Sequence, residues 1–545
     1  MKTNFNTIEN AFKPTDDGKC SISTGGMVSS QSAEASFAGA AMLKAGGNAV
    51  DAAIATALAL GVTEPQASGL GGQTMMLIGN KTRTIAVDGS SRAPSLAHVS
   101  AIYKRDRSLS YRASTVPSTP AVLWYIHNRY GLLPWKKIIE PAIRFAEEGY
   151  RITALQHNLL VREAEKFKKV QSQSGLHYFF KNSEAYQPGD VFIQKHLAAL
   201  LKKLADKGVE EFYKGKTAKI IDADMRENGG LLRYDDLALI PWPIERKPLK
   251  KKFNGLYVFS MPPPGSGRSL LFALLMLDLI PGKLRKMELN KKNLLLVKIL
   301  RQVFIDRSDR PFDPNFYPQI EEEKIMLSSR YARKCLKSIM QEVDGSILPS
   351  IPTDDELKGE TTHLSVIDRN GLAVSLTQSI ERVYGSKAAA RELGFLYNNY
   401  LFDFDYELPE HPFYLRPNAV PWATVAPTLI FHENDIWMAL GSPGSERIIS
   451  ALVTFLLHIT DEYLPVSEAM KAPRIHCSLG GRVSLEAGRF HPGLIQLLAD
   501  KGYRIDKRED FSFYLGCIQA VLKKHDHSGF QGVADVRRDG AAVGF

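Results

Sequence analysis

The sequence contains little cysteine. Its four cysteines, Cys20, Cys335, Cys477 and Cys517, are widely spaced among 545 residues and form no Cys-x-x-Cys pair. A zinc site built on thiolates and a redox-active dithiol both need closely spaced thiols. We therefore expect four free thiols and no metal.

Long apolar runs are also missing. The longest apolar stretch, around residues 270–277, is far shorter than the ~20 residues that cross a bilayer. Residues 1–7 have no apolar core of the kind that signal peptides carry. We expect no membrane partner and a cytoplasmic protein.

Acidic residues are outnumbered by basic ones. The chain has 59 Asp and Glu against 69 Lys and Arg, a formal charge of +10. Basic clusters occur at residues 247–252 and 283–292, but neither alternates with aromatic side chains as base-stacking surfaces do. We interpret them as solvated surface that attracts acidic substrates mildly, and we expect no nucleic acid partner.

What the sequence does contain is a threonine placed for nucleophilic catalysis. Residues 345–360 carry two prolines, two glycines and several charges, which predicts an exposed connection that ends at the Glu360–Thr361 bond. If this bond is cut, Thr361 becomes N-terminal. Its α-amine, with a reference pKa of ~7.7 to 8.0, then lies beside its own hydroxyl as a general base. One residue thus supplies both the nucleophile and the base.

A β-hairpin is predicted directly after this bond. Residues 362–367 and 372–377 have strand patterns, and the intervening Asp-Arg-Asn-Gly at 368–371 is typical of a tight turn. Antiparallel pairing then places Thr361 opposite residues 378–380. Ser379 and Glu381 are therefore expected near the proposed nucleophile.

Segments along the whole chain resemble those of the gamma-glutamyltranspeptidases, in the same order. The resemblance covers residues 25–540, which excludes a chance match to one motif. The matching segments are residues 46–53, 64–67, 71–72, 211–215, 228–231, 260–264, 361–368, 371–375, 394–399 and 441–444.

This resemblance implies an α/β (α+β) fold, the four-layer αββα sandwich of N-terminal nucleophile hydrolases, with a helix-rich large portion. The Thr361 hydroxyl would attack the Glu360 carbonyl and divide the chain into a large subunit, 1–360, and a small subunit, 361–545. Both would contribute strands to one interlocked domain, so the product would be a heterodimer of its own two fragments. No cofactor is implied.

The resemblance also assigns catalytic positions. Thr361 matches the nucleophile, and Ser379 replaces a supporting threonine while keeping its hydroxyl. Gly444 and Ser445 stand where the family has two glycines whose N–H groups stabilise the oxyanion, and Ser445 fits there if its φ is ordinary. His363 is expected to be structural, because the α-amine already provides the base.

The donor's ammonium group is bound in the family by an Asn, a Gln and an Asp. The corresponding residues here are Glu381, Tyr400 and Asp403. Two carboxylates beside an ammonium group are electrostatically favourable. We therefore expect amine recognition to persist.

The family's carboxylate-binding arginine has no direct counterpart. Ser90 occupies that position, and Arg92 lies two residues later. Arg92 replaces the missing arginine if the loop shifts. Arg382 and Arg416 are two other candidate cations nearby.

The two serines that bind the same carboxylate correspond to Ala423 and Thr424, so one hydroxyl is lost. The segment 403–423 is also shorter than in typical members. We expect a reduced lid and a more open donor pocket.

The resemblance implies hydrolysis or transfer of the γ-glutamyl group of glutathione and related amides through an acyl-enzyme on Thr361. Ser90 and Ala423 leave open an acylase with the same chemistry and another donor, such as a glutaryl group or a small amide like oxamate. An uncleaved binding scaffold is disfavoured because Thr361, Ser379 and Gly444 all remain.

Overall fold

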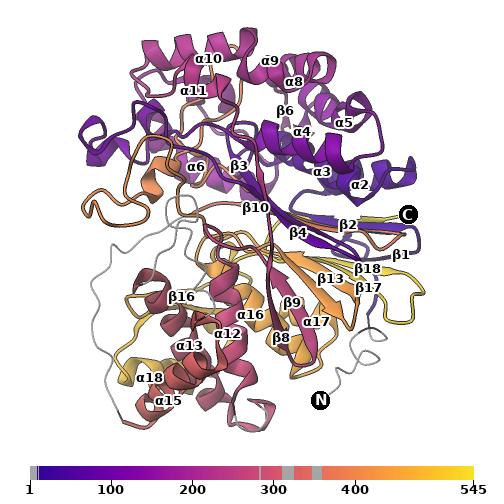
Figure 1. Ribbon diagram of the computed structural model, residues 1–545, viewed down its shortest axis with the longest axis vertical. Coiled ribbons are helices and arrows are strands. Elements are labelled where there is room, and N and C mark those ends of the chain that lie inside the picture. Colours follow the sequence, from indigo (N-terminus) through magenta and orange to yellow (C-terminus); the bar gives the residue numbers. More distant parts are fainter. Residues whose placement is uncertain (1–8, 10–11, 281–283, 310–324, 346–358) are drawn as a thin grey trace.

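Two antiparallel sheets form the centre of the molecule (Figure 1). The computed structural model describes residues 9, 12–280, 284–309, 325–345 and 359–545, so most of the connection expected at 345–360 lies outside these ranges. Within them, the first sheet has the order β1 (Cys20–Ser23), β18 (Phe530–Ala534), β17 (Gln519–Lys523), β13 (Asp435–Gly441), β12 (Thr428–His432), β9 (Leu256–Ser260) and β8 (Leu249–Phe253). The second has the order β19 (Ala541–Gly544), β2 (Gly26–Ser30), β10 (Thr362–Asp368), β11 (Ala373–Ser379), β3 (Gln73–Gly79), β4 (Thr84–Gly89) and β7 (Ile244–Arg246).

Helices cover the outer face of each sheet (Figure 1). The helical group over the second sheet includes α2 (Ala33–Lys44), α3 (Ala49–Thr63), α4 (Thr119–Tyr130), α5 (Trp135–Glu148), α6 (Ala154–Lys168), α8 (Lys195–Lys207) and α10 (Lys216–Glu227). The group over the first sheet includes α12 (Gly267–Asp278), α13 (Leu289–Asp309), α15 (Ser329–Gly345), α16 (Arg447–Thr460), α17 (Val466–Lys471) and α18 (Pro492–Asp500). A small sheet lies with the helices that cover the first sheet. It consists of β14 (Ile475–Cys477), β15 (Arg482–Glu486) and β16 (Arg504–Arg508).

Three buried apolar clusters lie between the four layers. One joins the first sheet to its helices and another joins the second sheet to its helices. The third lies between the sheets and includes Met75 and Ile367 of one sheet and Leu429 and Val521 of the other. Because side chains alternate along a strand, each buried sheet supplies apolar residues to two layers at once. The expected αββα sandwich is confirmed.

Both sheets draw strands from both sides of the Glu360–Thr361 bond. The first contains β1, β8 and β9 from before it, and the second places β10 and β11 between β2 and β3. A cut at this bond would leave the backbone ladders of both sheets unchanged. No helix in the described ranges is long and apolar enough to cross a membrane.

Helix α3 supports the hairpin from behind. It begins at the cap Asn48, whose side chain accepts from the N–H groups of Val50 and Asp51, while Asp51 accepts from the Asn48 N–H. This capping box satisfies donors that would otherwise be buried without partners. The carboxylate of Asp368, in the hairpin turn, accepts from the Ala49 N–H at 3.0 Å. The turn is thereby anchored to the start of the helix.

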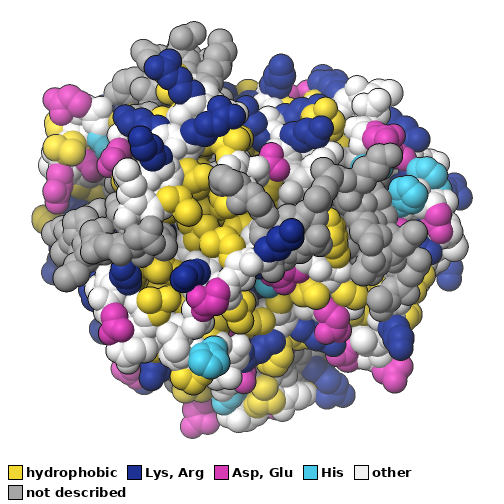
Figure 2. Space-filling model, turned by 90° about the horizontal axis from the view of Figure 1, so that it is seen from below, with side chains coloured by type: hydrophobic (Ala, Val, Ile, Leu, Met, Phe, Trp, Pro, Cys, Tyr) yellow, Lys and Arg dark blue, Asp and Glu magenta, His cyan; other side chains and the backbone are white. Residues whose placement is uncertain are grey.

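The surface of the lower helical layer carries mixed charge. Figure 2 shows Lys and Arg side chains spread over this face, with Asp and Glu between them and apolar side chains among both.

The four cysteines are free, as expected, and all four are buried.

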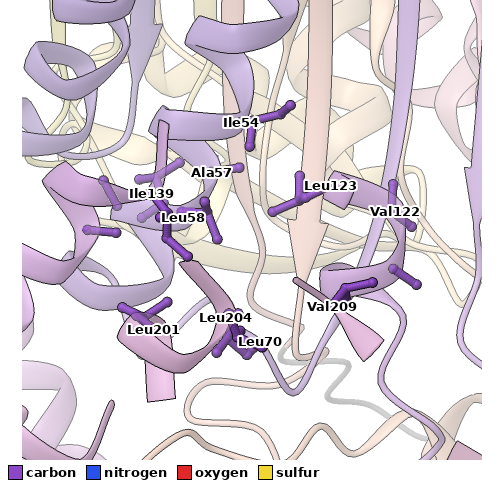
Figure 3. Packing of buried hydrophobic residues seen from close by; sticks show 14 of the residues in the cluster. Ile54, Ala57, Leu58, Leu70, Val122, Leu123, Ile139, Leu201, Leu204 and Val209 are labelled. Atoms are coloured by element: carbon purple, nitrogen blue, oxygen red, sulfur yellow. The ribbon is translucent and has the colours of Figure 1, made fainter. Parts of the chain in front are cut away.

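We expect Leu123→Ala to lower the stability of the fold. Leu123 of α4 is fully buried and lies against Ala57 and Leu58 of α3 (Figure 3). Truncating such a side chain removes apolar contacts and leaves a cavity, which costs about 2 to 5 kcal/mol. Thermal unfolding of the purified protein should show a clearly lower midpoint. Leu132→Ala, at a side chain that is 69% exposed, is the matched control and should leave the midpoint nearly unchanged.

Candidate active site

The hairpin brings two hydroxyl groups together at its open end. Strands β10 and β11 pair Thr362 with Gln378, which is the predicted register. One residue further along, the Thr361 Oγ1 donates to the Ser379 Oγ at 3.3 Å. Both residues are buried, so the expected juxtaposition of Thr361 and Ser379 is confirmed.

Ser379 also holds the bond that precedes Thr361. Its Oγ donates to the Glu360 carbonyl oxygen at 2.7 Å and accepts from the Glu381 N–H at 2.8 Å. The Glu360 N–H in turn donates to the Glu381 carbonyl at 2.5 Å. A donor on the carbonyl oxygen stabilises the negative charge that develops there when a nucleophile attacks the carbon. Ser379 is thus placed to assist cleavage of this bond.

Arg538 fixes the side chain of Glu360. Its guanidinium forms an ion pair with the Glu360 carboxylate and lies 3.7 Å from Glu64, and it donates to the Thr361 carbonyl at 3.4 Å. Burial raises the pKa of Glu64 to about 8. Arg538 therefore contacts residues on both sides of the bond. Sequence reasoning missed this arginine, which follows strand β18 and is remote in sequence.

Gly444 and Ser445 lie in the turn between β13 and helix α16. Their φ angles are 120° and 52°, so the condition set for Ser445, an ordinary φ, is not met. The chain reverses from strand to helix within a few residues, which forces a non-glycine residue into the left-handed region at a cost on the order of 1 to 3 kcal/mol. An ideal Cβ on Gly359 would lie 2.7 Å from the Ser445 Cβ. The segment just before the bond therefore packs directly against this turn.

Glu381 and Asp403 place two carboxyl groups together. Burial raises the pKa of Glu381, and burial together with the neighbouring Glu381 raises the pKa of Asp403 well above its usual range. Both residues are half-buried, and two adjacent carboxyl groups cannot both ionise cheaply, although Arg382 and Arg307 partly offset this cost. Tyr400 is buried beside Ser379 and Gln73. The three predicted ammonium-binding residues thus lie near the nucleophile.

A cavity of about 190 Å³ adjoins this pair. Its lining residues come from both sides of the bond at 360 and 361. They are Phe304, Arg307, Ser308, Glu381, Asp403, Trp422, Thr424, Ser445, Glu446 and Leu479. The predicted residues Glu381, Asp403, Thr424 and Ser445 are therefore brought together in one cavity.

Arg307 is one of the lining residues that sequence reasoning missed. It lies in α13 and is buried, and its guanidinium donates to the Thr424 Oγ1 at 2.9 Å. The available signal was spacing: Arg307 follows Val303 by four residues and Phe304 by three, which puts it on the same face of a helix as these apolar side chains. A charge on a buried helix face needs a partner.

The predicted carboxylate-binding arginines lie elsewhere. Arg92 is exposed and pairs its backbone with Val116, Arg382 stacks on Phe402 with 3.7 Å from its guanidinium carbon to the ring centroid, and Arg416 donates to the Pro409 carbonyl. None of the three lines the cavity. The loop shift that would bring Arg92 in does not occur.

Ser90 and Ala423 do not line the cavity either. The Ser90 hydroxyl donates to Asp88 at 2.6 Å, and Asp88 forms an ion pair with Arg246 at 2.8 Å. Ala423 is buried among the apolar residues between the sheets. Ala423 therefore has a packing role, because its methyl group cannot form a hydrogen bond with a polar ligand.

His363 is packed as a neutral residue between the sheets. Its Nδ1 lies 2.8 Å from the Thr377 Oγ1 and its Nε2 lies 3.1 Å from the Ser365 Oγ. Burial lowers its pKa to about 3, so the ring is uncharged at neutral pH. An ideal Cβ on Gly441 would lie 2.2 Å from this ring, which explains why the facing strand has glycine there. In the described ranges, no group of three or more His, Cys, Asp or Glu could hold a metal ion.

Comparison with known proteins identifies the family. The family model for gamma-glutamyltranspeptidase matches residues 35–545. The chain belongs to the gamma-glutamyltranspeptidase family. It is accordingly an N-terminal threonine hydrolase or acyltransferase, whose relatives are made as proenzymes.

Similar relatives include two kinds of enzyme. The chain is 31% identical to the glutathione hydrolase proenzyme of Escherichia coli, over 91% of this chain and 88% of that protein. It is 28% identical to an acylase ACY 1 proenzyme of Pseudomonas sp., over 97% of this chain and 95% of that protein. Among solved structures, a cephalosporin acylase from Bacillus halodurans matches with a TM-score of 0.86 and 25% identity, covering 96% of this chain and 97% of that one. The gamma-glutamyltranspeptidase of Helicobacter pylori matches with a TM-score of 0.52 and 30% identity, covering 59% of this chain and 91% of that one.

We expect Ser379→Ala to slow cleavage of the Glu360–Thr361 bond by about a hundredfold. Removing one hydrogen-bond donor from a developing oxyanion lowers a reaction rate by about this factor. The measurement is the rate at which intact precursor disappears on a denaturing gel after synthesis in a cell-free system. Ser379→Thr keeps the hydroxyl and should cleave at a rate close to that of the unchanged protein. Equal rates for the Ala and Thr variants would contradict this role.

We expect Asp403→Asn to stabilise the protein at neutral pH. The folded pKa of Asp403 lies well above 3.8, so its contribution to stability is present below that value and is lost as the pH rises through the folded pKa. Asn carries no such dependence. The unfolding midpoint of Asp403→Asn minus that of the unchanged protein should therefore increase from pH 4 to pH 8. Glu410→Gln, at an exposed residue nearby, should show a constant difference.

Proposed function

We infer that this protein cleaves itself between Glu360 and Thr361 and then hydrolyses or transfers the γ-glutamyl group of glutathione and related amides. The observation that carries the proposal is the hydrogen-bond chain at the hairpin end, in which the Thr361 hydroxyl donates to Ser379 and the Ser379 hydroxyl donates to the Glu360 carbonyl, beside the pair Glu381 and Asp403.

Self-cleavage would use the contacts already present in the precursor. The Thr361 hydroxyl attacks the Glu360 carbonyl carbon and passes its proton toward Ser379, while the carbonyl oxygen becomes an oxyanion held by the Ser379 hydroxyl. Collapse of the oxyanion breaks the peptide C–N bond, and the proton given up by the Thr361 hydroxyl passes on to the leaving nitrogen. The products are an ester on the Thr361 oxygen and a free α-amine. Water then hydrolyses the ester and releases Glu360 as a new carboxyl terminus.

Turnover would repeat the attack on a substrate amide. The new α-amine removes the proton from the Thr361 hydroxyl, which attacks the donor's side-chain carbonyl and expels the amine of the leaving group. Backbone N–H groups at Gly444 and Ser445, just before the N-terminus of α16, would stabilise the oxyanion. Water or an acceptor amine then resolves the acyl-enzyme.

The acidic pair supports a γ-glutamyl donor over a glutaryl donor. An α-ammonium group beside Glu381 and Asp403 would release their shared proton and form charge-assisted hydrogen bonds. A glutaryl group has a carboxylate and no ammonium, so nothing on it would neutralise the pair. The acylase alternative keeps support from the ACY 1 and cephalosporin acylase relatives.

The decisive experiment combines mass spectrometry with kinetics. The purified protein should contain two chains in place of one of 60.6 kDa, and the smaller should begin Thr-Thr-His. Thr361→Ala should stay intact and inactive, because it has no nucleophile, whereas Thr361→Ser should cleave and keep part of the activity. The mature enzyme should prefer γ-glutamyl-p-nitroanilide to glutaryl-p-nitroanilide, measured as kcat/KM. An active but intact protein would contradict the mechanism, and the reverse preference would establish the acylase alternative.

A further inference from the structure

The donor cavity contains a buried cation with unused hydrogen-bonding capacity. Arg307 stacks on Trp422, with 4.4 Å from its guanidinium carbon to the ring centroid, and donates from Nη2 to the Thr424 Oγ1 at 2.9 Å. Its Nη1 is buried and has no hydrogen-bond partner among the described residues. A buried guanidinium N–H without a partner carries a large desolvation cost, so such a group is typical of a site that a ligand completes.

The charges around Arg307 keep it cationic. Burial lowers its pKa to about 10, and the carboxyl groups of Glu446, Asp403 and Glu381 partly offset this, while Arg268 adds to it. The guanidinium therefore remains charged at neutral pH. Its two fixed N–H directions suit a planar carboxylate.

The cavity is lined by groups of both charges. Arg307, bonded to Thr424, lines the same 190 Å³ as the carboxyl groups of Glu381, Asp403 and Glu446. An α-amino acid group carries an ammonium and a carboxylate on one carbon. A cavity with an anionic pair and a cation matches both groups of such a ligand.

The position expected to bind the carboxylate does not serve this purpose. Ser90 is occupied by Asp88, and Arg92 is exposed. Thr424, in contrast, keeps one hydroxyl of the expected serine pair and presents it to Arg307.

We propose that Arg307, held by Thr424 and Trp422, binds the α-carboxylate of the acyl donor. The inference rests on the proposed function and names the residue that takes over the missing arginine's task. Arg307 makes donor selection depend on a carboxylate, while Glu381 and Asp403 make it depend on an ammonium group.

The test compares three p-nitroanilides that differ in one group each. The γ-glutamyl compound has both charged groups, the 4-aminobutyryl compound lacks the carboxylate, and the glutaryl compound lacks the ammonium. Arg307→Met should reduce kcat/KM for the γ-glutamyl compound by about 10²-fold, because a buried charge pair is lost. It should reduce kcat/KM for the 4-aminobutyryl compound by less than threefold and that for the glutaryl compound as strongly as for the γ-glutamyl one.

Matched variants separate this role from a structural one. Arg391→Met removes an exposed arginine and should change none of the three rates. Arg92→Met tests the competing cation, and a carboxylate-dependent loss there would overturn the proposal. Equal losses for Arg307→Met on the γ-glutamyl and 4-aminobutyryl compounds would also overturn it.

The conservative variant Arg307→Lys keeps the proposal testable if Arg307→Met is not cleaved into two chains. If Arg307→Met stays uncleaved on a gel, Arg307→Lys is assayed instead, and it must show a loss confined to the two carboxylate-bearing compounds. Failure of the proposed function would look different, because the unchanged enzyme would then not turn over the γ-glutamyl compound at all.

Discussion

The chemistry of this protein depends on the antiparallel pairing of β10 with β11. That pairing sets Ser379 opposite Thr361 and gives Ser379 the Glu360 carbonyl as its acceptor. A shift of one residue in the register would turn Ser379 to the other face of the sheet and leave the Thr361 hydroxyl without its neighbour. The register is secured at the turn by Asp368, which bonds the backbone of the hairpin and of helix α3.

The space between the two sheets changes character along its length. Far from the site it is filled by apolar side chains such as Met75 and Leu429. Close to the site it contains His363 and Ser365, and Ser365 donates to the Gln519 carbonyl of the facing sheet. His363 and Ser365 both have hydrogen-bond partners, which makes this part of the interior specific about geometry. Because both sheets combine strands from either side of residue 360, cleavage would break one chain connection without dividing the core.

The donor cavity holds several charges that are costly in a folded protein. The carboxyl groups of Glu381 and Asp403 and the guanidinium of Arg307 are all buried enough for their pKa values to shift toward the neutral form. Such a site has lower stability than an apolar one of the same volume. Before cleavage, Gly359 packs against Ser445 and Glu381 at its edge. A ligand with complementary charges would recover part of the electrostatic cost after that segment leaves.

The sequence by itself determined the four-layer fold, the hairpin, its register and the nearness of Ser379 and Glu381 to Thr361, because these follow from local strand patterns, one tight turn and a resemblance along the whole chain. It also indicated a structural His363. The sequence could not locate Arg307 and Arg538, and the structure does not meet the conditions under which Arg92 and Ser445 were expected to serve. Arg307 enters the cavity from helix α13 and Arg538 reaches Glu360 from beyond β18. Contacts between residues so far apart in the chain are decided by how the layers pack, and no local pattern encodes that packing.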